Sequence, residues 1–174
     1  MPLDAPSDHL LNNLCNWPGA SHLHVGLLKG GSFIAALAGN QGLLQEQIGV
    51  DWCEEVAQEI LERNCRRYLE AGSYQIVNCD CFQLDRTLFH APVDVYFYDA
   101  DHSLKAHERA FTAFDDLFAD VFIAVVDDWD CAWIRKPTFR AFDKLGYAML
   151  FQGVIPASLR NGNGQYVAVI RRRL

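Results

Sequence analysis

The sequence predicts an α/β protein built on a doubly wound, mostly parallel sheet of seven strands that closes with an antiparallel C-terminal hairpin. Short apolar runs alternate with segments of helical periodicity, which is the pattern of a parallel sheet covered by helices on both faces. The strand-like runs are almost continuously apolar, as expected for strands buried on both sides. No helix fits between the last two runs, so these two strands should pair antiparallel.

The N-terminal part begins with a helix expected at Asp8–Asn16, where leucines recur at helical spacing until Pro18-Gly19 ends the pattern. A short strand is expected at His22–Val25, and a glycine-rich turn leads from it into a helix at Ser32–Leu37. The next short apolar run, Ile48–Asp51, indicates the second strand.

The middle of the chain continues this alternation. Apolar residues at helical spacing predict a helix at Glu54–Leu69, and a short apolar run predicts a strand at Tyr74–Val77. The runs Val93–Tyr98 and Val121–Val126 indicate two strands of the buried type. A helical period between them predicts a helix at Ser103–Phe118.

The C-terminal part carries the expected hairpin. Tyr147–Ile155 and Gln165–Arg171 are both β-like, and the strong turn signal Asn161-Gly162-Asn163-Gly164 lies between them. The preceding segment Trp129–Arg140 combines aromatic and basic residues. It either borders a site for a flat or anionic molecule, or forms an amphipathic helix with its aromatic side chains in the core.

Length and composition predict one domain, residues 1–174, in which residues 1–19 form an N-terminal helical segment. The net charge of −7 argues against nucleic acid as a partner, because a protein that binds nucleic acid usually has a basic surface. No apolar stretch is long enough to cross a membrane and the N-terminus lacks the pattern of a signal peptide, so the cytoplasm is the expected location. The six cysteines form no C-x-x-C pair, which makes a zinc site an unfavourable reading.

A glycine turn follows the first predicted strand, with Gly26, Gly30 and Gly31 ahead of Ser32. Glycines let the backbone approach a ligand closely, and a helix start behind them favours an anion. The spacing excludes the G-x-G-x-x-G pattern because position 28 is Leu, and it excludes a P-loop because Lys29 does not directly precede the serine. Taken alone, the turn fits a tight strand-to-helix connection equally well.

Polar residues also end the second and third predicted strands. Asp51 is placed to accept hydrogen bonds from ribose hydroxyls, or to cap the helix that follows. Trp52 either covers an adenine or packs in the protein, and Asp80 either binds an adenine amino group or is a turn residue.

Carboxylates gather at two further strand ends. Asp99 follows the strand Val93–Tyr98, while Asp127 and Asp128 follow Val121–Val126. Ligands of open α/β sheets bind beyond the carboxyl ends of the strands, so these three side chains should converge if the strands are neighbours. Grouped carboxylate oxygens suit a hard cation such as Mg²⁺ or Ca²⁺.

With these strand ends in place, the sequence resembles the class I S-adenosylmethionine (SAM)-dependent methyltransferases, which have a Rossmann-like fold. Within that class it most resembles the small metal-dependent O-methyltransferases, which include the catechol, caffeoyl-coenzyme-A and antibiotic-sugar enzymes. The matching segments follow the family order: Leu23–Gly26, Gly30–Ser32, Gly49–Asp51, Cys79–Phe82, Asp99–Ser103 and Asp127–Trp129. His24 departs from the family, which usually has an acidic residue there.

The resemblance implies a role for each matching residue. The methionine portion of SAM would lie on the glycine turn, at Gly26, Gly30, Gly31 and Ser32. The adenosine would be held at the next strand ends, by Asp51, Trp52, Asp80, Cys81 and Phe82. A divalent cation, in the first place Mg²⁺, would be held by Asp99, Asp127 and Asp128.

The chemistry implied is methyl transfer to a hydroxyl group of a small molecule, with two vicinal hydroxyls of this acceptor completing the metal shell. A bound cation lowers the pKa of a hydroxyl and orients its oxygen. Asp99 and His102 are the candidate catalytic residues, with His102 as general base because an imidazole titrates near pH 6.5. The alternative for His102 is a solvent-facing residue at the start of a helix. Asp101 is either a second cofactor contact or a helix cap.

Two other functions fit the same residues. The protein could be a metal-independent methyltransferase whose aspartates only accept hydrogen bonds, or a non-catalytic module with a methyltransferase fold. The short N-terminal region leaves little chain for the helical lid of the family, so a second subunit of a homodimer is a further expected partner.

Overall fold

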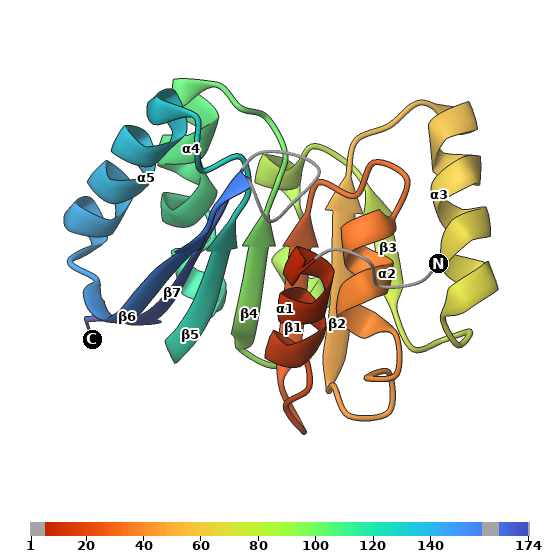
Figure 1. The fold of residues 1–174 in the computed structure, drawn as a ribbon. Coiled ribbons are helices and arrows are strands. Elements are labelled where there is room, and N and C mark those ends of the chain that lie inside the picture. The colour runs from red at the N-terminus through yellow and green to blue at the C-terminus, as the bar shows by residue number, and fades with distance from the viewer. Residues whose placement is uncertain (1–5, 158–163, 174) are drawn as a thin grey trace.

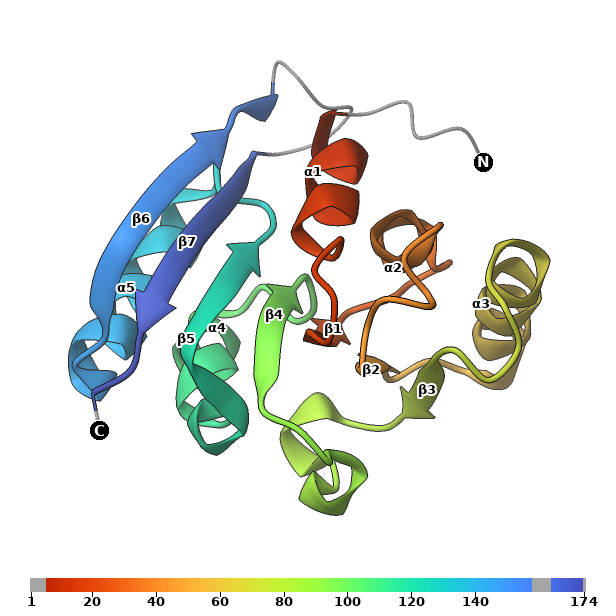
Figure 2. The same ribbon diagram turned by 90° about the horizontal axis from the view of Figure 1, so that it is seen from below.

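The computed structural model describes residues 6–157 and 164–173 and contains the predicted seven-stranded sheet, with strands in the order β3-β2-β1-β4-β5-β7-β6 (Figures 1 and 2). The strands are β1 (Ser21–Val25), β2 (Glu46–Asp51), β3 (Gln75–Asn78), β4 (Val93–Tyr98), β5 (Phe118–Val126), β6 (Ala148–Ile155) and β7 (Gln165–Arg171). The turn predicted at 161–164 lies, except for its last residue, outside the described residues.

The pairing confirms the mixed sheet. Strands β3, β2, β1, β4 and β5 are parallel to their neighbours, whereas β7 runs antiparallel to both β5 and β6. The hairpin therefore inserts its second strand between β5 and its first strand, and β6 forms the edge of the sheet (Figure 2).

Within residues 6–157 and 164–173, five α-helices cover the sheet: α1 (Pro6–Leu14), α2 (Gly31–Leu37), α3 (Glu55–Tyr68), α4 (Leu104–Thr112) and α5 (Ala132–Leu145). Two hydrophobic clusters hold the layers together. One contains residues of α1, α2 and α3, and the other contains residues of α4 and α5. In Figure 1, α1 and α2 lie in front of the central strands. None of the helices among the described residues has the length and the apolar character that a membrane crossing requires.

The predicted helix Ser103–Phe118 is too long at its C-terminal end. Helix α4 ends at Thr112, a 3₁₀ turn spans Asp115–Leu117, and β5 begins already at Phe118. Phe114 and Leu117 keep helical spacing because the 3₁₀ turn also directs them into the core, where both are buried. The spacing of the apolar residues therefore predicted which residues are buried, but it did not distinguish an α-helix from a 3₁₀ turn.

In the segment Trp129–Arg140, one tryptophan is buried as the core reading expects, and the other is exposed. Trp129 is buried and stacks on Tyr166, with ring centroids 4.1 Å apart, as the core reading expects. Trp133 lies on α5 and is 57% exposed. Neither tryptophan lines the large cavity described below.

Two buried histidines on β1 give the fold a measurable pH dependence. His22 and His24 are both at most 1% exposed, and burial lowers the pKa of His22 to about 3 and that of His24 well below its usual range. Neither ring nitrogen of His22 has a hydrogen-bond partner among the described residues. The imidazoles are therefore neutral in the folded chain.

We expect the free energy of unfolding to fall as the pH drops from 6.5 to 5.5. Unfolded histidines take up protons near pH 6.5 and the buried ones do not, so acid favours the unfolded chain, by about 2 kcal/mol for the two residues together. Urea denaturation at both pH values measures this loss. His22→Leu should make the loss about 1 kcal/mol smaller, and an unchanged loss in that variant would contradict the assignment.

Candidate functional site

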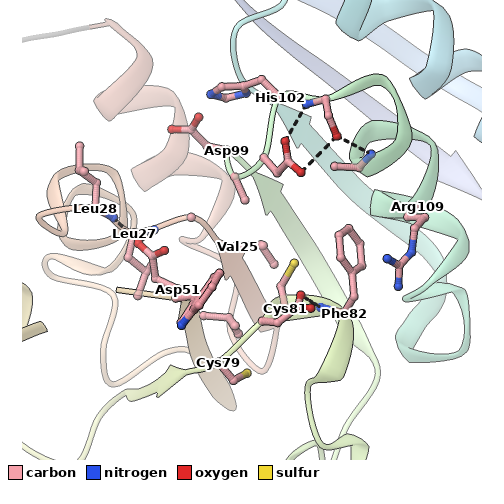
Figure 3. Close-up of a pocket in the computed structure, with 18 of the residues that line it drawn as sticks. Val25, Leu27, Leu28, Asp51, Cys79, Cys81, Phe82, Asp99, His102 and Arg109 are labelled. Carbon is pink, nitrogen blue, oxygen red and sulfur yellow. Dashed lines mark hydrogen bonds between the residues drawn. The ribbon is translucent and has the colours of Figure 1, made fainter. Parts of the chain in front are cut away.

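A cavity of about 960 Å³ opens at the carboxyl ends of β1, β2 and β4 (Figure 3). Its wall combines the turn after β1, the end of β2, the loop after β3 and the segment between β4 and α4. Most of the residues that the sequence nominated line it: Gly26, Gly31, Ser32, Asp51, Trp52, Asp80, Cys81, Phe82, Asp99, Asp101 and His102. Three nominated residues do not: Gly30, Asp127 and Asp128.

Gly26 allows the backbones at the ends of β1 and β4 to lie very close to each other. Its φ is +92°, and a Cβ atom at this position would overlap the backbone carbonyl of Asp99. The Asp99 amide donates a hydrogen bond to the Val25 carbonyl at 2.8 Å, which fixes this approach. Glycine is required here because it tolerates the positive φ and has no Cβ atom that would overlap the Asp99 carbonyl.

Gly30 was expected to contact the methionine portion of SAM, but it packs against α3. It stands at the N-terminal end of α2 with φ +87°, where a Cβ atom would lie 3.0 Å from a methyl group of Leu61 and 3.3 Å from the Cys65 sulfur. Gly30 therefore allows the turn to pack against α3, and it does not form the cavity wall.

Asp51 holds the glycine turn in place. Its Oδ2 accepts hydrogen bonds from the amides of Leu27, at 2.9 Å, and Leu28, at 2.6 Å. Leu28 has a φ of +51°, a conformation that is uncommon for a residue with a side chain. The N-cap of α3 is Glu54, so Asp51 does not cap that helix.

Trp52 stands at the mouth of the cavity beside Asp51. It is 82% exposed, so the alternative that it packs in the interior is wrong. A large exposed indole on a cavity wall is available to cover a planar group.

The loop after β3 forms the opposite wall. Asp80 accepts a hydrogen bond from the Phe82 amide at 2.9 Å and caps the 3₁₀ turn Cys81–Gln83. The Phe82 ring lies 4.0 Å from the guanidinium carbon of Arg109, a cation–π contact that holds the ring in place. Burial raises the pKa of the Cys81 thiol to about 12, so this thiol is protonated and a weak nucleophile.

The segment between β4 and α4 is ordered by Asp101 and Ser103. Ser103 is the N-cap of α4, and its Oγ accepts a hydrogen bond from the Ala106 amide. Asp101 accepts hydrogen bonds from both the amide, at 2.8 Å, and the hydroxyl of Ser103 (Figure 3). Asp101 thus supports the cap while it also lines the cavity.

Asp99, His102 and Asp128 form one group at the edge of the cavity. Each offers a potential ligand atom, and these atoms all lie within 4.8 Å of one another. The His102 Nε2 is 3.2 Å from Asp128 Oδ2. His102 is exposed and lies just before α4, as the solvent-facing alternative expects, and it also contacts Asp128. Its ring also lies nearly parallel to that of buried His107, with centroids 6.1 Å apart.

Asp127 does not join this group, although the sequence predicted that it would. The Asp127 amide donates to the Tyr98 carbonyl and so continues the β4–β5 ladder, and its side chain is only 8% exposed. Asp128 then turns the chain with a φ of +56°, and its carboxylate reaches His102. Both aspartates lie beyond the end of β5, and the left-handed backbone of Asp128 separates its direction from that of Asp127, which is why the two do not both join the group.

His24 lies behind the cavity wall and does not line it. Its Nε2 is 3.0 Å from the Ser32 hydroxyl, and its ring packs on Phe97 with centroids 4.1 Å apart. Where the resemblance expects an acidic residue, the chain therefore has a buried neutral imidazole that positions Ser32.

Sequence reasoning missed Lys105 and Arg109, which line the cavity from α4. Their four-residue spacing, directly after the segment Asp99–Ser103, puts both on one helix face, and this signal was present in the sequence.

No protein-family model matches the sequence, and no curated protein matches it. Solved structures do match the fold. Rv0187 from MTB, solved with its cofactor, has a TM-score of 0.72 at 19% identity, and the match covers 96% of this chain and 78% of that one. The O-methyltransferase TomG from Streptomyces achromogenes, involved in tomaymycin synthesis and solved with SAM, has a TM-score of 0.71 at 18% identity, over 95% of this chain and 80% of that one.

A third match is the O-methyltransferase from Bacillus cereus in complex with S-adenosylhomocysteine (SAH), with a TM-score of 0.67 at 14% identity, over 95% of this chain and 79% of that one. Together with the strand order, these matches show that the chain has the Rossmann-like fold of the SAM-dependent methyltransferases.

Proposed function

We propose that this protein is a SAM-dependent methyltransferase that methylates a hydroxyl group of a small molecule with the help of a divalent cation. The observation that carries the proposal is the cavity itself, which joins the Asp51-held glycine turn to Asp99 and His102. Solved proteins of the same fold bind SAM or SAH.

The residues of the cavity fit the cofactor. Gly26 and Gly31 bring bare backbone to the wall, which is what close approach of a ligand needs. The Asp51 carboxylate lies at the end of β2, where an acid binds ribose hydroxyls in dinucleotide-type folds. Trp52 and Phe82 offer the planar surfaces that suit an adenine ring. When bound, SAM supplies a methyl group on a sulfonium centre.

The carboxylates of Asp99 and Asp128 would hold the cation, since both are oxygen donors in the group at the edge of the cavity. A bound divalent cation lowers the pKa of a hydroxyl at neutral pH. Asp99 and His102 face the cavity, so an acceptor with two vicinal hydroxyls would meet this end of it. The cavity walls then orient the hydroxyl toward the methyl group and exclude water.

A second candidate, the metal-independent methyltransferase, is favoured by the contact between His102 and Asp128. In this mechanism the His102 Nε2–H donates a hydrogen bond to Asp128, which leaves the unprotonated Nδ1 to accept the proton of the acceptor hydroxyl. A chelator would abolish turnover in the first mechanism and leave it unchanged in the second.

Calorimetric titration of the purified chain with SAM and SAH tests the function. We expect both to bind, and we expect Trp52→Ala to weaken SAM binding by about tenfold, because loss of stacking on a base costs roughly 1–3 kcal/mol. Trp133→Ala is the matched control, since Trp133 is also exposed but does not line the cavity. If the wild-type chain binds neither compound, the methyltransferase proposal is wrong and the non-catalytic module is favoured.

The remaining expectations about partners stay predictions. These are a small-molecule acceptor with vicinal hydroxyls, a homodimer and a cytoplasmic location.

A further inference from the structure

We propose that His24 is a positioning residue that fixes the direction of the Ser32 hydroxyl proton, so that this hydroxyl donates into the cavity and selects the carboxylate of the cofactor's amino-acid portion. The proposal rests on the proposed function, because SAM and SAH are the ligands that carry this carboxylate. It concerns a departure of this chain from the family that it resembles, since an acidic residue was expected where His24 stands.

The contact between His24 and Ser32 joins the interior of the protein to the cavity wall. His24 lies on β1 and is 0% exposed, whereas Ser32 lies on α2, is partly exposed and lines the cavity. The His24 Nε2 and the Ser32 Oγ are 3.0 Å apart. Among the residues that the structure describes, His24 is the one hydrogen-bond partner of the Ser32 hydroxyl.

Burial keeps the imidazole of His24 neutral. The pKa of His24 lies well below its usual range because burial disfavours the charged form, and neighbouring His22 lowers it further. A neutral imidazole has one N–H group and one bare nitrogen, so its Nε2 either donates to Ser32 or accepts from it. These two tautomers leave opposite sides of the hydroxyl, its proton or its lone pairs, for the cavity.

The other ring nitrogen, Nδ1, favours one of the two tautomers. The Nδ1 of His24 is buried and has no hydrogen-bond partner within the described parts of the chain. Its surroundings are aromatic, with the ring centroids of Phe97 at 4.1 Å and of Phe33 at 5.6 Å from that of His24. A buried N–H without a partner is rarer in proteins than an incompletely used acceptor. The geometry therefore favours a bare Nδ1 and a protonated Nε2.

This tautomer sets the polarity of the Ser32 hydroxyl. The Nε2–H donates to the Ser32 Oγ, so the hydroxyl cannot direct its own proton back to the imidazole. No described residue accepts that proton, and it is available to a ligand in the cavity. A hydroxyl that donates suits a carboxylate oxygen and not an ammonium group. An acidic residue in place of His24 would accept the serine proton and leave only lone pairs for the ligand.

Nitrogen NMR of the ligand-free chain tests the tautomer. With ¹⁵N-labelled histidine, we expect His24 to show a protonated Nε2 and a bare Nδ1, and these signals should stay unchanged from pH 7 to pH 5.5 because burial prevents protonation. His24→Leu assigns the signals by removing them. Ser32→Ala should shift the Nε2 signal of the same residue, which a purely structural role of His24 does not predict. A protonated Nδ1 would overturn the proposal.

Calorimetric titration of the full chain tests the selectivity with three ligands. These are SAH, its decarboxylated analogue S-adenosyl-3-thiopropylamine and its deaminated analogue S-adenosyl-4-thiobutyrate. In the wild-type chain, loss of the carboxylate should weaken binding at least tenfold, because hydrogen bonds to a charged group are among the strong ones. This weakening should be at least fivefold smaller in Ser32→Ala, whereas loss of the amino group should have the same effect in both chains.

The histidine variants separate positioning from burial. His24→Leu should make the effect of the carboxylate about threefold smaller, because a hydroxyl without a fixed partner distributes over about three staggered positions. His22→Leu is the matched control. His22 is also buried on β1, and neither of its ring nitrogens has a hydrogen-bond partner among the described residues, so this variant should leave the effect of the carboxylate unchanged.

Two binding results contradict the proposal: an equal effect of the carboxylate in wild type and Ser32→Ala, or an equal change in His22→Leu and His24→Leu. If His24→Leu does not fold, the wild-type spectrum and the Ser32→Ala titrations decide. SAH separates this proposal from the proposed function. A chain that binds neither SAM nor SAH contradicts both, whereas SAH binding with the other tautomer, or without the effect of Ser32, contradicts only the role of His24.

Discussion

Gly26→Ala is expected to lower the free energy of unfolding by about 3 kcal/mol or more and to abolish SAM binding. The added Cβ would overlap the carbonyl of Asp99, and the residue would also have to keep a φ of +92°. Overpacking of a tight contact costs about 1–3 kcal/mol, and a left-handed backbone costs a residue with a side chain about 1–2 kcal/mol more. Relief of the overlap requires the ends of β1 and β4 to move apart, which opens the cavity between the glycine turn and Asp99.

Gly72→Ala separates these two costs. Gly72 has nearly the same φ, +80°, but a Cβ atom there would meet nothing within 4 Å. Gly72→Ala should lower the free energy of unfolding by about 1–2 kcal/mol and leave the SAM affinity unchanged. Urea denaturation and calorimetry on both variants provide the comparison, and equal losses of stability would show that the approach of β1 to Asp99 is not what requires glycine.

Asp51→Ala is expected to weaken SAM binding by about 100-fold. The carboxylate accepts two backbone hydrogen bonds from Leu27 and Leu28, and loss of hydrogen bonds to a charged group costs about 1.5–3 kcal/mol. Without this acceptor, Leu28 has no compensation for its positive φ, and the turn that faces the cofactor relaxes. The variant would therefore lose both the proposed contact to the cofactor and the order of the turn.

Asp51→Asn distinguishes the two contributions. An amide oxygen still accepts from the two backbone amides, so the free energy of unfolding should stay close to wild type while SAM affinity falls at least tenfold. Asp85→Asn is the control: Asp85 likewise accepts from a backbone amide, that of Thr87, but lies away from the cavity. Unchanged SAM affinity in Asp51→Asn would exclude Asp51 from cofactor binding.

The strand ends show how far local patterns reach. Gly26, Asp51 and Asp99 each follow a short apolar run, and the parallel arrangement of β1, β2 and β4 brings all three to one cavity. This outcome was predictable because continuous apolar runs between helices specify a parallel sheet, and parallel strands end at the same edge.

The errors occurred where a residue's role depends on what lies across from it. Gly30 looked like part of the ligand-binding turn, but its neighbours are Leu61 and Cys65 on α3. Asp127 and Asp128 looked equivalent in sequence, yet in the part of the chain that the structure describes the group with Asp99 and His102 contains Asp128 and not Asp127. Neither distinction can be read from spacing, because both depend on the φ of single residues and on elements far away in the chain.

The sequence by itself determined the order and type of the elements, the mixed sheet and the edge at which the polar residues gather, because hydrophobic period and turn residues are local properties of the chain. Only the tertiary structure decided which side chains meet: that Asp51 holds the glycine turn, that His24 lies behind Ser32, and that His102 contacts Asp128. The physical reason is that a contact requires two surfaces, and the packing of elements that are distant in the sequence sets where each side chain points.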